Sequence, residues 1–540
     1  MLAIILSAGS VPHEITALFR CPSVGLIPIN GRPLVALQID LLRRLGATEI
    51  KVALRGRDTR LKEYLVQYSR LFDISVSIVE ITTDRGPGGT MVEALKPDDF
   101  GKGVLVLLGD TLIEPDAPLV LGADNVVFTS PVDEPQRWCM VSADTFGAVT
   151  ALADKPAAVL PGAEAAVGCY WFGRVDAATW SALSDTLGTR IEISTLLEGV
   201  RCSHGLSRRR ITGWLDCGNV DLLVATRRRM IAARSFNSLV IDELRGTVRK
   251  RSTHGDKFRH EINYYRLLPD DLSVFFPRLI SHETAQPDAH VELEYYAYPT
   301  ISEVYIYEEY GDSFWAAVID KLGAVLGEFS HRHAAIRSSD CAAFYTSKLE
   351  RRLADARAQS GELARLLALP EIIVNGVVLR GVPLLLDALV RELTALSQSV
   401  SGAVIHGDLC FANILLEPLN KTIRLIDPRG SFHEVGIFGD ARYDHAKLWH
   451  SVDGHYDAII NDMFSVKVAG DAAEFDCYRP RARAQVLRRL EAILPVGVSR
   501  REVRIIEGSL FLSMLPLHAD HPRRQLAMLF SGLCILNEEL

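Results

Sequence analysis

The sequence lacks any cysteine arrangement that would staple a fold or hold zinc. Its nine cysteines include no CxxC pair and follow no regular spacing. Scattered thiols of this kind are typical of reduced, intracellular proteins. No apolar run is long enough to span a bilayer, and the apolar start Leu2–Leu6 has no basic leader. We therefore expect a cytoplasmic protein without membrane insertion.

An excess of positive charge is also missing. The formal net charge is −8, which gives no general attraction for nucleic acid or an anionic membrane. The basic runs Arg208–Arg210 and Arg227–Arg229 are more typical of a solvated face than of a binding patch. We expect nucleotides and a small molecule as partners, and the sequence leaves a homo-oligomer open.

A chain of 540 residues is too long for one hydrophobic core, so several domains are expected. In the first 230 residues, short apolar runs alternate with helical patterns such as residues 33–46. The runs that read as buried strands are Leu2–Ala8, Ile50–Leu54, Ile74–Ile81 and Val104–Leu108. This rhythm predicts an α/β domain with a mostly parallel sheet, in which ligands bind beyond the carboxyl ends of the strands.

The pattern changes after a predicted helix at Ala225–Leu239. Paired strands turning at Gly246 overlap its end, a helix over residues 256–269 follows, and long amphipathic helices dominate from about Ser313. We therefore expect a first domain at residues 1–230, a small lobe at 236–300 and a helical lobe at 301–540.

A phosphoryl-transfer constellation runs through the second half. "HGDLCFAN" places Asp408 five residues before Asn413, and Asp427 follows the apolar run "TIRLI". Upstream, Lys250 lies on a predicted strand and Glu261 on the next helix. Transfer of a γ-phosphoryl group needs a carboxylate near the attacking hydroxyl, magnesium ligands and a cation on the phosphates. These five residues are of the required types, in the required order.

Other residues near this constellation have more than one interpretation. Glu294 and Tyr296, in "LEYY", fit a connector whose backbone meets the adenine. His406 is expected to brace the loop, and Asp444 is expected to be structural. Arg429, beside the metal-type Asp, either meets an anionic substrate or fixes the loop; the sequence leaves both open.

From about Phe236 to the C-terminus the chain resembles the aminoglycoside and choline kinase-like phosphotransferases, through "HGDLCFANIL", "IDPRG" and "GDARYDHAKLWHS". The resemblance implies an α+β bilobal protein-kinase-like fold, ATP, Mg²⁺ and a small alcohol such as choline, ethanolamine, a polyol or a sugar. It makes Asp408 the base, Asn413 and Asp427 magnesium ligands, and Lys250 with Glu261 the phosphate-side pair. Tyrosine-rich stretches could cage a quaternary ammonium, although core packing is their commoner use.

Residues 2–225 resemble the sugar-phosphate and choline-phosphate nucleotidyltransferases, through "LAIILSAGS", "GPGGTMVEAL", "VLVLLGDTLI", "ADKPAA" and "GWLDCGN". The resemblance implies a Rossmann-like fold and attack of a phosphomonoester on the α-phosphate of an NTP. Lys155 would meet the acceptor phosphate. The residues implied as magnesium ligands are Asp110 and Asp216, and those implied in nucleotide binding are Ala8, Gly9, Ser10, Gly88 and Gly89.

This half departs from the family at two points. The phosphate loop lacks the second glycine and the arginine of the family pattern, and Val24 stands where the family has its catalytic lysine. Such a cation typically contributes about 3 kcal/mol to the transition state. Arg20 and Arg32 are the candidates to replace it, because both lie close in sequence.

The two halves are complementary, because a kinase makes a phosphomonoester and a nucleotidyltransferase consumes one. We therefore interpret the chain as a bifunctional enzyme that couples its product to a second NTP, with CTP a candidate, as in surface-glycan or capsule synthesis. Three alternatives stay open. In the first, the N-terminal half is a degenerate nucleotide-binding regulator of an active kinase. In the second, the kinase modifies a drug. In the third, both folds form a non-enzymatic scaffold.

Overall fold

The computed structural model describes residues 1–72, 74–115, 119, 121–158, 160–186, 190–232, 237–252, 255–285 and 289–540. They form two compact units. The first comprises Met1–Arg229 with Tyr307–Glu309, and the second comprises Met230–Ile306 with Tyr310–Leu540. Each of the nine cysteines lies in the described part and is free, as predicted. None of the described helices combines the length and the apolarity that crossing a bilayer requires.

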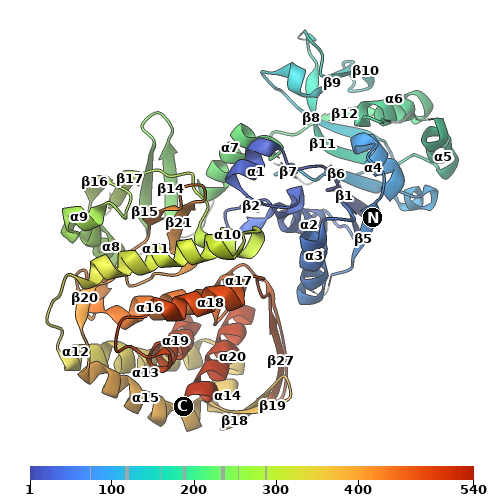
Figure 1. Ribbon diagram of the computed structural model, residues 1–540. Helices are drawn as coiled ribbons and strands as arrows, with labels where there is room; N and C mark the ends of the chain where they lie inside the picture. The colour runs from blue at the N-terminus through green and yellow to red at the C-terminus, as the bar shows by residue number, and fades with distance from the viewer. Residues whose placement is uncertain are drawn as a thin grey trace. The chain divides into compact units, whose positions relative to one another are not determined.

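A mixed sheet organises the first unit (Figure 1). Its parallel part has the strand order β6-β1-β4-β5, and Leu6 of β1 is in register with Ala53 of β4 and Leu108 of β6. Every residue of β1 is buried, as expected for a strand covered on both faces. The bounds are β1 Leu2–Leu6, β4 Glu49–Arg55, β5 Val76–Ile81 and β6 Val104–Leu108. The carboxyl ends of these strands therefore meet at one edge.

Antiparallel strands extend the sheet beyond β6. β11 pairs with β6, β8 and β9, and a separate ladder joins β7 to β13 and sets Asp216 opposite Thr111. These strands are β7 Thr111–Ile113, β8 Val126–Ser130, β9 Cys139–Ala143, β10 Val149–Asp154, β11 Glu164–Phe172, β12 Ser207–Arg210 and β13 Trp214–Asp216; the short pair β2 Pro28–Ile29 and β3 Arg32–Pro33 lies apart. The α/β class is confirmed, and its parallel strands carry the first candidate site.

Helices α2 and α4 both pack on β1. α2 begins after Pro33, and Gly46 just beyond it takes a left-handed φ of 88°, so the predicted helix at residues 33–46 is confirmed. The helices in residues 1–232 are α1 His13–Leu18, α2 Leu34–Arg44, α3 Thr59–Phe72, α4 Gly86–Ala94, α5 Ala177–Thr186, α6 Ile193–His204 and α7 Val220–Ala232.

The second unit begins with an antiparallel sheet of order β14-β15-β17-β16. Its first hairpin turns at Gly246, whose φ is 61°, and α8 follows it. The bounds are β14 Asn237–Asp242, β15 Thr247–Ser252, α8 Gly255–Leu267, α9 Asp270–Ser273, β16 Leu279–Glu283 and β17 His290–Glu294. The predicted hairpin and the helix after it are thus present.

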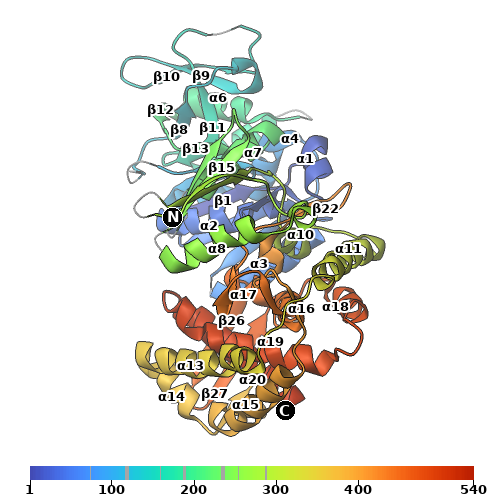
Figure 2. The same ribbon diagram turned by 90° about the vertical axis from the view of Figure 1, so that its left-hand side faces the viewer.

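The rest of this unit is mainly helical (Figures 1 and 2). α19 packs along α20 and against α16. The helices are α10 Ile301–Tyr307, α11 Asp312–Ser330, α12 Ser338–Ala342, α13 Lys348–Gln359, α14 Gly361–Ala368, α15 Val382–Gln398, α16 Ala441–Val452, α17 Tyr456–Ile460, α18 Arg483–Ala492, α19 Arg500–Met514 and α20 Pro522–Glu539. Two-stranded ladders flank the loops that carry the candidate site: β20 Gly402–Val404 with β25 Phe438–Asp440, β21 Ile414–Glu417 with β22 Thr422–Leu425, and β23 Ser431–Phe432 with β24 Glu434–Val435.

One predicted element was wrong in part, and one sheet was not predicted. The predicted helix at Ala225–Leu239 ends at Ala232, and Leu239 lies in β14; Phe236 falls outside the described residues. Helix-forming residues continue past Ala232 in the sequence, so composition did not mark the end. The sequence also did not reveal a sheet of order β19-β18-β27-β26, because its short strands stand between long helices. They are β18 Glu371–Val374, β19 Val377–Arg380, β26 Phe464–Ala469 and β27 Ala472–Cys477.

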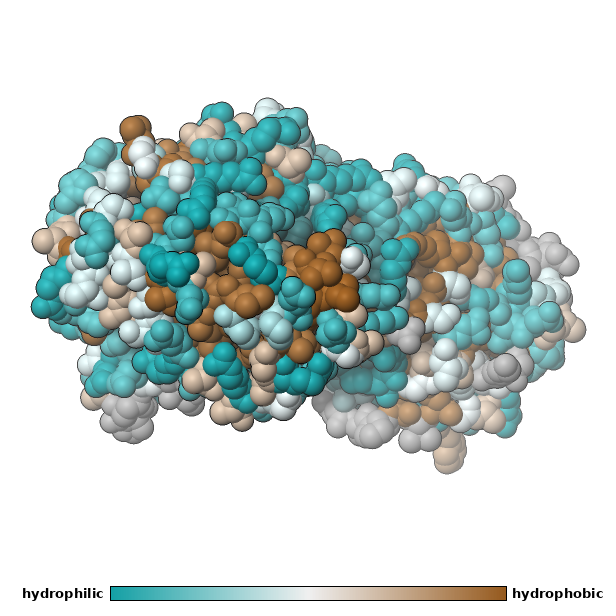
Figure 3. Space-filling view, turned by 90° about the horizontal axis from the view of Figure 1, so that it is seen from below, coloured by the Kyte–Doolittle hydropathy of each residue, from teal (hydrophilic) through white to brown (hydrophobic). Residues whose placement is uncertain are grey.

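The face seen from below carries brown apolar patches between teal polar side chains (Figure 3). In the second unit, Val377 and Val378 on β19 and Leu384 on α15 are each at least half exposed. None of the predicted site residues lies on these two elements.

Candidate active sites

A cavity of about 360 Å³ lies at the carboxyl ends of the parallel strands in the first unit. Ala8, Gly9 and Ser10, which follow β1, line it together with Gly109 and Asp110, which follow β6. The structure therefore brings the predicted phosphate loop and one predicted metal carboxylate into the same space. The cavity lies where ligands bind in open α/β sheets, beyond the carboxyl ends of the strands.

Asp110 and Asp216 converge at the turn after β13. The backbone N–H of Gly218 donates to Asp216 Oδ1 at 2.9 Å, and that of Cys217 donates to the main-chain oxygen of Asp110 at 2.8 Å. A Cβ added to Gly218 would lie 2.7 Å from Asp110 Oδ2 and 3.5 Å from Asp216 Oδ1. Both carboxylates therefore lie beside Gly218, where the Cβ of any other residue would come too close to Asp110.

These two carboxylates resist ionising together. Burial raises the pKa of both, and the charge of Asp110 adds to the effect on Asp216, whose pKa is raised to about 7. A divalent cation would relieve this repulsion, and Mg²⁺ commonly takes one or two carboxylates and completes its shell with phosphate oxygens and water. Asp110 and Asp216 therefore fit a magnesium site, where the ion would neutralise phosphate charge.

The cations of this cavity are not the ones that sequence proximity suggested. Val24 lines the cavity, but Arg20 and Arg32 do not, and Arg32 pairs with Asp40 at 2.7 Å. Instead Arg55 and Arg190 line it. Sequence reasoning missed both, although the position of Arg55 at the end of β4 was a usable signal.

Arg55 and Arg190 differ in how they are held. Arg55 donates from Nε to the carbonyl oxygen of Ala8 at 2.7 Å, which ties it to the phosphate loop. Arg190 is 74% exposed and pairs with Glu192, with 2.8 Å between Nε and Oε1. Arg55 therefore supports the loop, whereas the exposed Arg190 is the better placed to move toward a phosphate.

Gly88 and Gly89 lie beside the cavity in α4 but do not line it. A Cβ on Gly88 would lie 2.7 Å from the carbonyl oxygen of Glu192, and one on Gly89 would lie 2.4 Å from Cβ of Arg85. The two glycines therefore let the start of α4, whose Gly86, Pro87 and Thr90 do line the cavity, pack closely on its neighbours.

Lys155 does not line this cavity either. It follows β10 with a left-handed φ of 45°, and its N–H donates to the carbonyl oxygen of Trp138 at 2.9 Å. The ring of Trp138 packs edge-on against Trp214, two residues before Asp216, with 4.7 Å between the centroids. The strained backbone of Lys155 is thus linked to the carboxylate turn through an aromatic pair.

In the second unit, one ammonium joins three elements. Nζ of Lys250 on β15 lies 2.9 Å from each Oε of Glu261 on α8 and 2.9 Å from Oδ1 of Asp427. Only 11% of the Lys250 and of the Glu261 side chain is exposed. Burial alone would lower the pKa of Lys250, but Asp427 and Glu261 together raise it above its ordinary value. The lysine is therefore held charged.

Asp408 is held from two sides. Its Oδ1 lies 2.9 Å from Nζ of Lys447 on α16, and Asn413 donates from Nδ2 to its main-chain oxygen at 2.9 Å and to Oδ2 at 3.2 Å. Burial would raise the pKa of Asp408, yet Lys447 outweighs it and the pKa falls below its ordinary value. Sequence reasoning missed Lys447, although it stands three residues after Asp444 on the same helix.

A buried network fixes the loop that carries Asp408. Asp444 accepts hydrogen bonds from the N–H groups of His406 at 2.6 Å and Gly407 at 2.8 Å. Nδ1 of His406 accepts from the N–H of Asp408 at 3.2 Å, and Nε2 lies 3.0 Å from the oxygen of Ile426. Burial lowers the pKa of His406 to about 4, so the ring is neutral and Nε2 donates. His406 thus braces the loop against the strand before Asp427.

A cavity of about 380 Å³ gathers these groups. Lys250, Glu261, Asp408, Asp427 and Arg429 all line it. Asp427 adopts a left-handed φ of 57°, a strained conformation for a residue with a Cβ.

Three predicted residues lie outside the lining of this cavity. Asn413 donates a hydrogen bond to Asp408 but does not itself line the cavity. Glu294 and Tyr296 also lie outside the lining, and the Tyr296 hydroxyl donates to Glu294 at 3.0 Å. Tyr264 and Tyr305, from the predicted cage segments, are at least 97% buried and also lie outside it.

The carboxylate of Asp427 and the side-chain amide oxygen of Asn413 are ligand types that Mg²⁺ accepts. Within the described ranges, no three His, Cys, Asp or Glu side chains gather into a metal-binding group. Magnesium in either cavity would therefore draw its remaining ligands from nucleotide phosphates and water. The ion would supply charge neutralisation at the phosphates.

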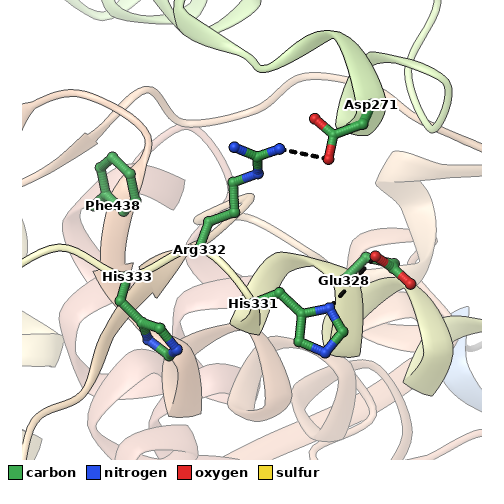
Figure 4. Close-up of a pocket in the computed structure, with 6 residues that line it drawn as sticks. All are labelled: Asp271, Glu328, His331, Arg332, His333 and Phe438. Carbon is green, nitrogen blue, oxygen red and sulfur yellow. Dashed lines mark hydrogen bonds and ion pairs between the residues drawn. The ribbon is translucent and has the colours of Figure 1, made fainter.

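A third hollow, of about 500 Å³, has no relation to these groups (Figure 4). Asp271, Glu328, His331, Arg332, His333 and Phe438 line it. Figure 4 shows Arg332 extending toward Asp271, and the two form an ion pair at 2.6 Å. Both side chains are largely exposed, so solvent screens the pair and it contributes little to stability. We therefore interpret this hollow as a feature of the surface and not as a candidate active site.

No family model matches the chain. Two proteins of Oryza sativa subsp. japonica, assigned as mannose-1-phosphate guanylyltransferases 2 and 3, are each 25% identical over 140 residues. The match covers 24% of this chain and 39% of each relative, so it spans about two-fifths of their length.

A solved structure from Bacillus anthracis, assigned as a glucose-1-phosphate thymidylyltransferase in complex with a sucrose, is 17% identical. It covers 44% of this chain and 97% of its own, with a TM-score of 0.38. The sequence matches to the two rice proteins carry the conclusion: the N-terminal region of this chain resembles sugar-phosphate nucleotidyltransferases.

Proposed function

We propose that the chain is a bifunctional transferase whose second unit phosphorylates a small alcohol and whose first unit couples a phosphomonoester to an NTP. The observation that carries the proposal is the meeting of Lys250, Glu261 and Asp427 beside the Asp408–Asn413 loop in one cavity. The sequence predicts a kinase-like pair of lobes that begins at residue 236. All of these residues then belong to one kinase-like domain.

In the first step, the oxygen of the acceptor hydroxyl bonds to the γ-phosphorus of ATP as the bond to the β–γ bridging oxygen breaks. The hydroxyl proton passes to Asp408, and ADP leaves. Lys447 keeps Asp408 ionised, and Asn413 orients it. Lys250, positioned by Glu261, supplies positive charge to the nucleotide phosphates.

In the second step, an oxygen of the phosphomonoester bonds to the α-phosphorus of an NTP, and pyrophosphate leaves. The loop Ala8–Ser10 offers backbone N–H groups to the phosphates, and Asp110 and Asp216 form the metal-type pair. The two relatives named for mannose-1-phosphate favour a sugar phosphate as the acceptor class over choline phosphate. The sequence-based candidates, CTP as the NTP and surface glycan as the destination, remain parts of the proposal.

Paired variants of the full chain test this proposal. With ATP, Mg²⁺ and a panel of alcohols, we expect ADP formation that Asp408→Asn lowers at least about 1,000-fold. With NTPs and sugar 1-phosphates, we expect pyrophosphate release that Asp110→Asn abolishes. Each variant serves as the control for the other activity. ADP formation equal in the wild type and Asp408→Asn would refute the kinase assignment.

A second candidate function is favoured by Val24, the apolar residue that lines the first cavity where the family has a lysine. In this reading the first unit binds nucleotide without turning it over and regulates the kinase. Nucleotide binding without pyrophosphate release from any NTP and phosphomonoester pair would support it.

A further inference from the structure

Unbalanced positive charge lines part of the cavity in the second unit. Four cationic side chains, named here the basic cluster, come from α8, from α13 and from the loop after β22; they are Lys257, Lys348, Arg352 and Arg429. Within the part of the chain that the structure describes, none of the four forms an ion pair with a carboxylate.

The acids of the same cavity do not offset this charge. Its lining holds six Lys and Arg side chains but only three carboxylates, Glu261, Asp408 and Asp427. Each of the three already contacts Lys250 or Lys447 at 2.9 Å. The basic cluster is therefore the part of the charge that no carboxylate of the cavity lining offsets.

Two members of the cluster share one aromatic surface. Nζ of Lys348 lies 3.9 Å and the guanidinium carbon of Arg429 5.0 Å from the centroid of the Phe344 ring. Arg429 also donates to the hydroxyl of Tyr443 at 3.2 Å. Burial, and next the charge of Arg429, lowers the pKa of Lys348 well below its ordinary value. A bound anion would stabilise cations held this close together.

The cluster also lies next to the proposed base. The N–H of Arg429 donates to the carbonyl oxygen of His406 at 2.9 Å, two residues before Asp408. Gly407 has a φ of 77°, and a Cβ there would lie 2.8 Å from Cβ of Arg429. The absence of a side chain at Gly407 lets Arg429 lie against the loop, on the side where an acceptor hydroxyl would approach Asp408.

We propose that the basic cluster binds a phosphate or carboxylate group carried by the alcohol that the second unit phosphorylates. The inference rests on the proposed kinase function and names its substrate class: an anionic alcohol, such as a sugar acid or a sugar phosphate. Cationic alcohols such as choline and ethanolamine are then poor acceptors, because the uncompensated charge repels them.

Binding of inorganic phosphate tests the cluster without turnover. The probe is phosphate titrated into the full chain saturated with ADP and Mg²⁺, followed by calorimetry. We expect Lys348→Gln and Arg352→Gln each to raise the phosphate Kd at least tenfold. Arg357→Gln, an exposed arginine on the same helix, is the matched control and should leave it unchanged. Phosphate that does not bind, or that binds these variants as it binds the wild type, overturns the proposal.

A second arm separates the acceptor from ATP as the source of the anion. We expect the two cluster variants to keep the wild-type Kd for ATP and to lose at least tenfold in the preference, measured by kcat/KM, for glucuronate and glucose 6-phosphate over glucose and choline. An equal loss of ATP affinity would assign the cluster to the nucleotide and overturn the proposal, as would a wild-type preference for choline. If no alcohol is turned over, the kinase assignment fails, and the phosphate titration still decides whether the anion site exists.

Discussion

At the scale of single residues, the two cations that line the first cavity differ in their freedom to move. Val24 contributes no charge, and Arg55 is engaged with the loop backbone at Ala8. Arg190 is the exposed guanidinium at the rim. Charge supplied to the α-phosphate in a nucleotidyl transfer therefore has Arg190 as its most available source.

We predict that Arg190→Gln lowers kcat for pyrophosphate release about 100-fold, because one well-placed donor contributes about 3 kcal/mol to a transition state. Steady-state pyrophosphate assays with saturating NTP measure this. Arg32→Gln is the matched control: its partner is Asp40, so it should lower Tm with little effect on kcat. An Arg190→Gln enzyme with wild-type kcat would remove Arg190 from the reaction.

At the scale of elements, the turn between β13 and α7 sets the spacing of two carboxylates. Gly218 donates its N–H to Asp216, and its α-carbon faces Asp110. Any other residue type would place its Cβ 2.7 Å from Asp110 Oδ2, too close for the carboxylate to keep its position. In the proposed magnesium site, the turn is thus a determinant of the spacing of the ligands, although Gly218 supplies no ligand atom.

Gly218→Ala should therefore weaken Mg²⁺ binding at the first unit at least tenfold, because the new methyl group displaces Asp110 Oδ2. The Mg²⁺ dependence of pyrophosphate release measures the effect. Gly122→Ala, where nothing lies within 4 Å of the added carbon, is the control. An unchanged magnesium requirement in Gly218→Ala would show that the carboxylates tolerate the shift and that the turn does not define the site.

Element order also explains what the sequence could predict about the second site. Lys250 lies within a strand, Glu261 within the next helix, and Asp408 and Asp427 in loops that follow strands. Their order along the chain is recognisable, so spacing found them. Lys348 and Arg352 lie on α13 and Lys447 lies on the buried helix α16, and the sequence alone does not distinguish such a cation from any other basic residue on a helix. Only the packing of α13 and α16 against the loops brings these residues to the cavity.

At the scale of the whole molecule, stability depends also on groups that line neither cavity. Glu507 on α19 is fully buried, and burial raises its pKa from 4.5 to about 8, with Arg504 opposing the shift. Between pH 4.5 and about pH 8, Glu507 loses its proton in the unfolded chain but keeps it in the folded chain. The free energy of unfolding contributed by this group therefore falls as pH rises through that window and is fully lost above about pH 8.

We predict that Glu507→Gln removes this dependence. The Tm of the variant should exceed that of the wild type by a few degrees at about pH 9, and the difference should shrink toward about pH 5, where the wild-type carboxyl is neutral. Thermal unfolding at three pH values measures it, with Glu491→Gln, an exposed glutamate, as the control. A difference that grows toward acid pH would contradict the assigned sign.

The fastening of Lys250 to both Glu261 and Asp427 has a consequence for how the second unit responds to its ligand. A nucleotide phosphate entering the cavity competes with Asp427 for the same ammonium, while Glu261 keeps its hold from α8. Filling the cavity thus loosens the link between the small sheet and the loop after β22 and leaves the sheet joined to its own helix. Nucleotide occupancy and the angle between these two parts would then be thermodynamically linked, each able to shift the other.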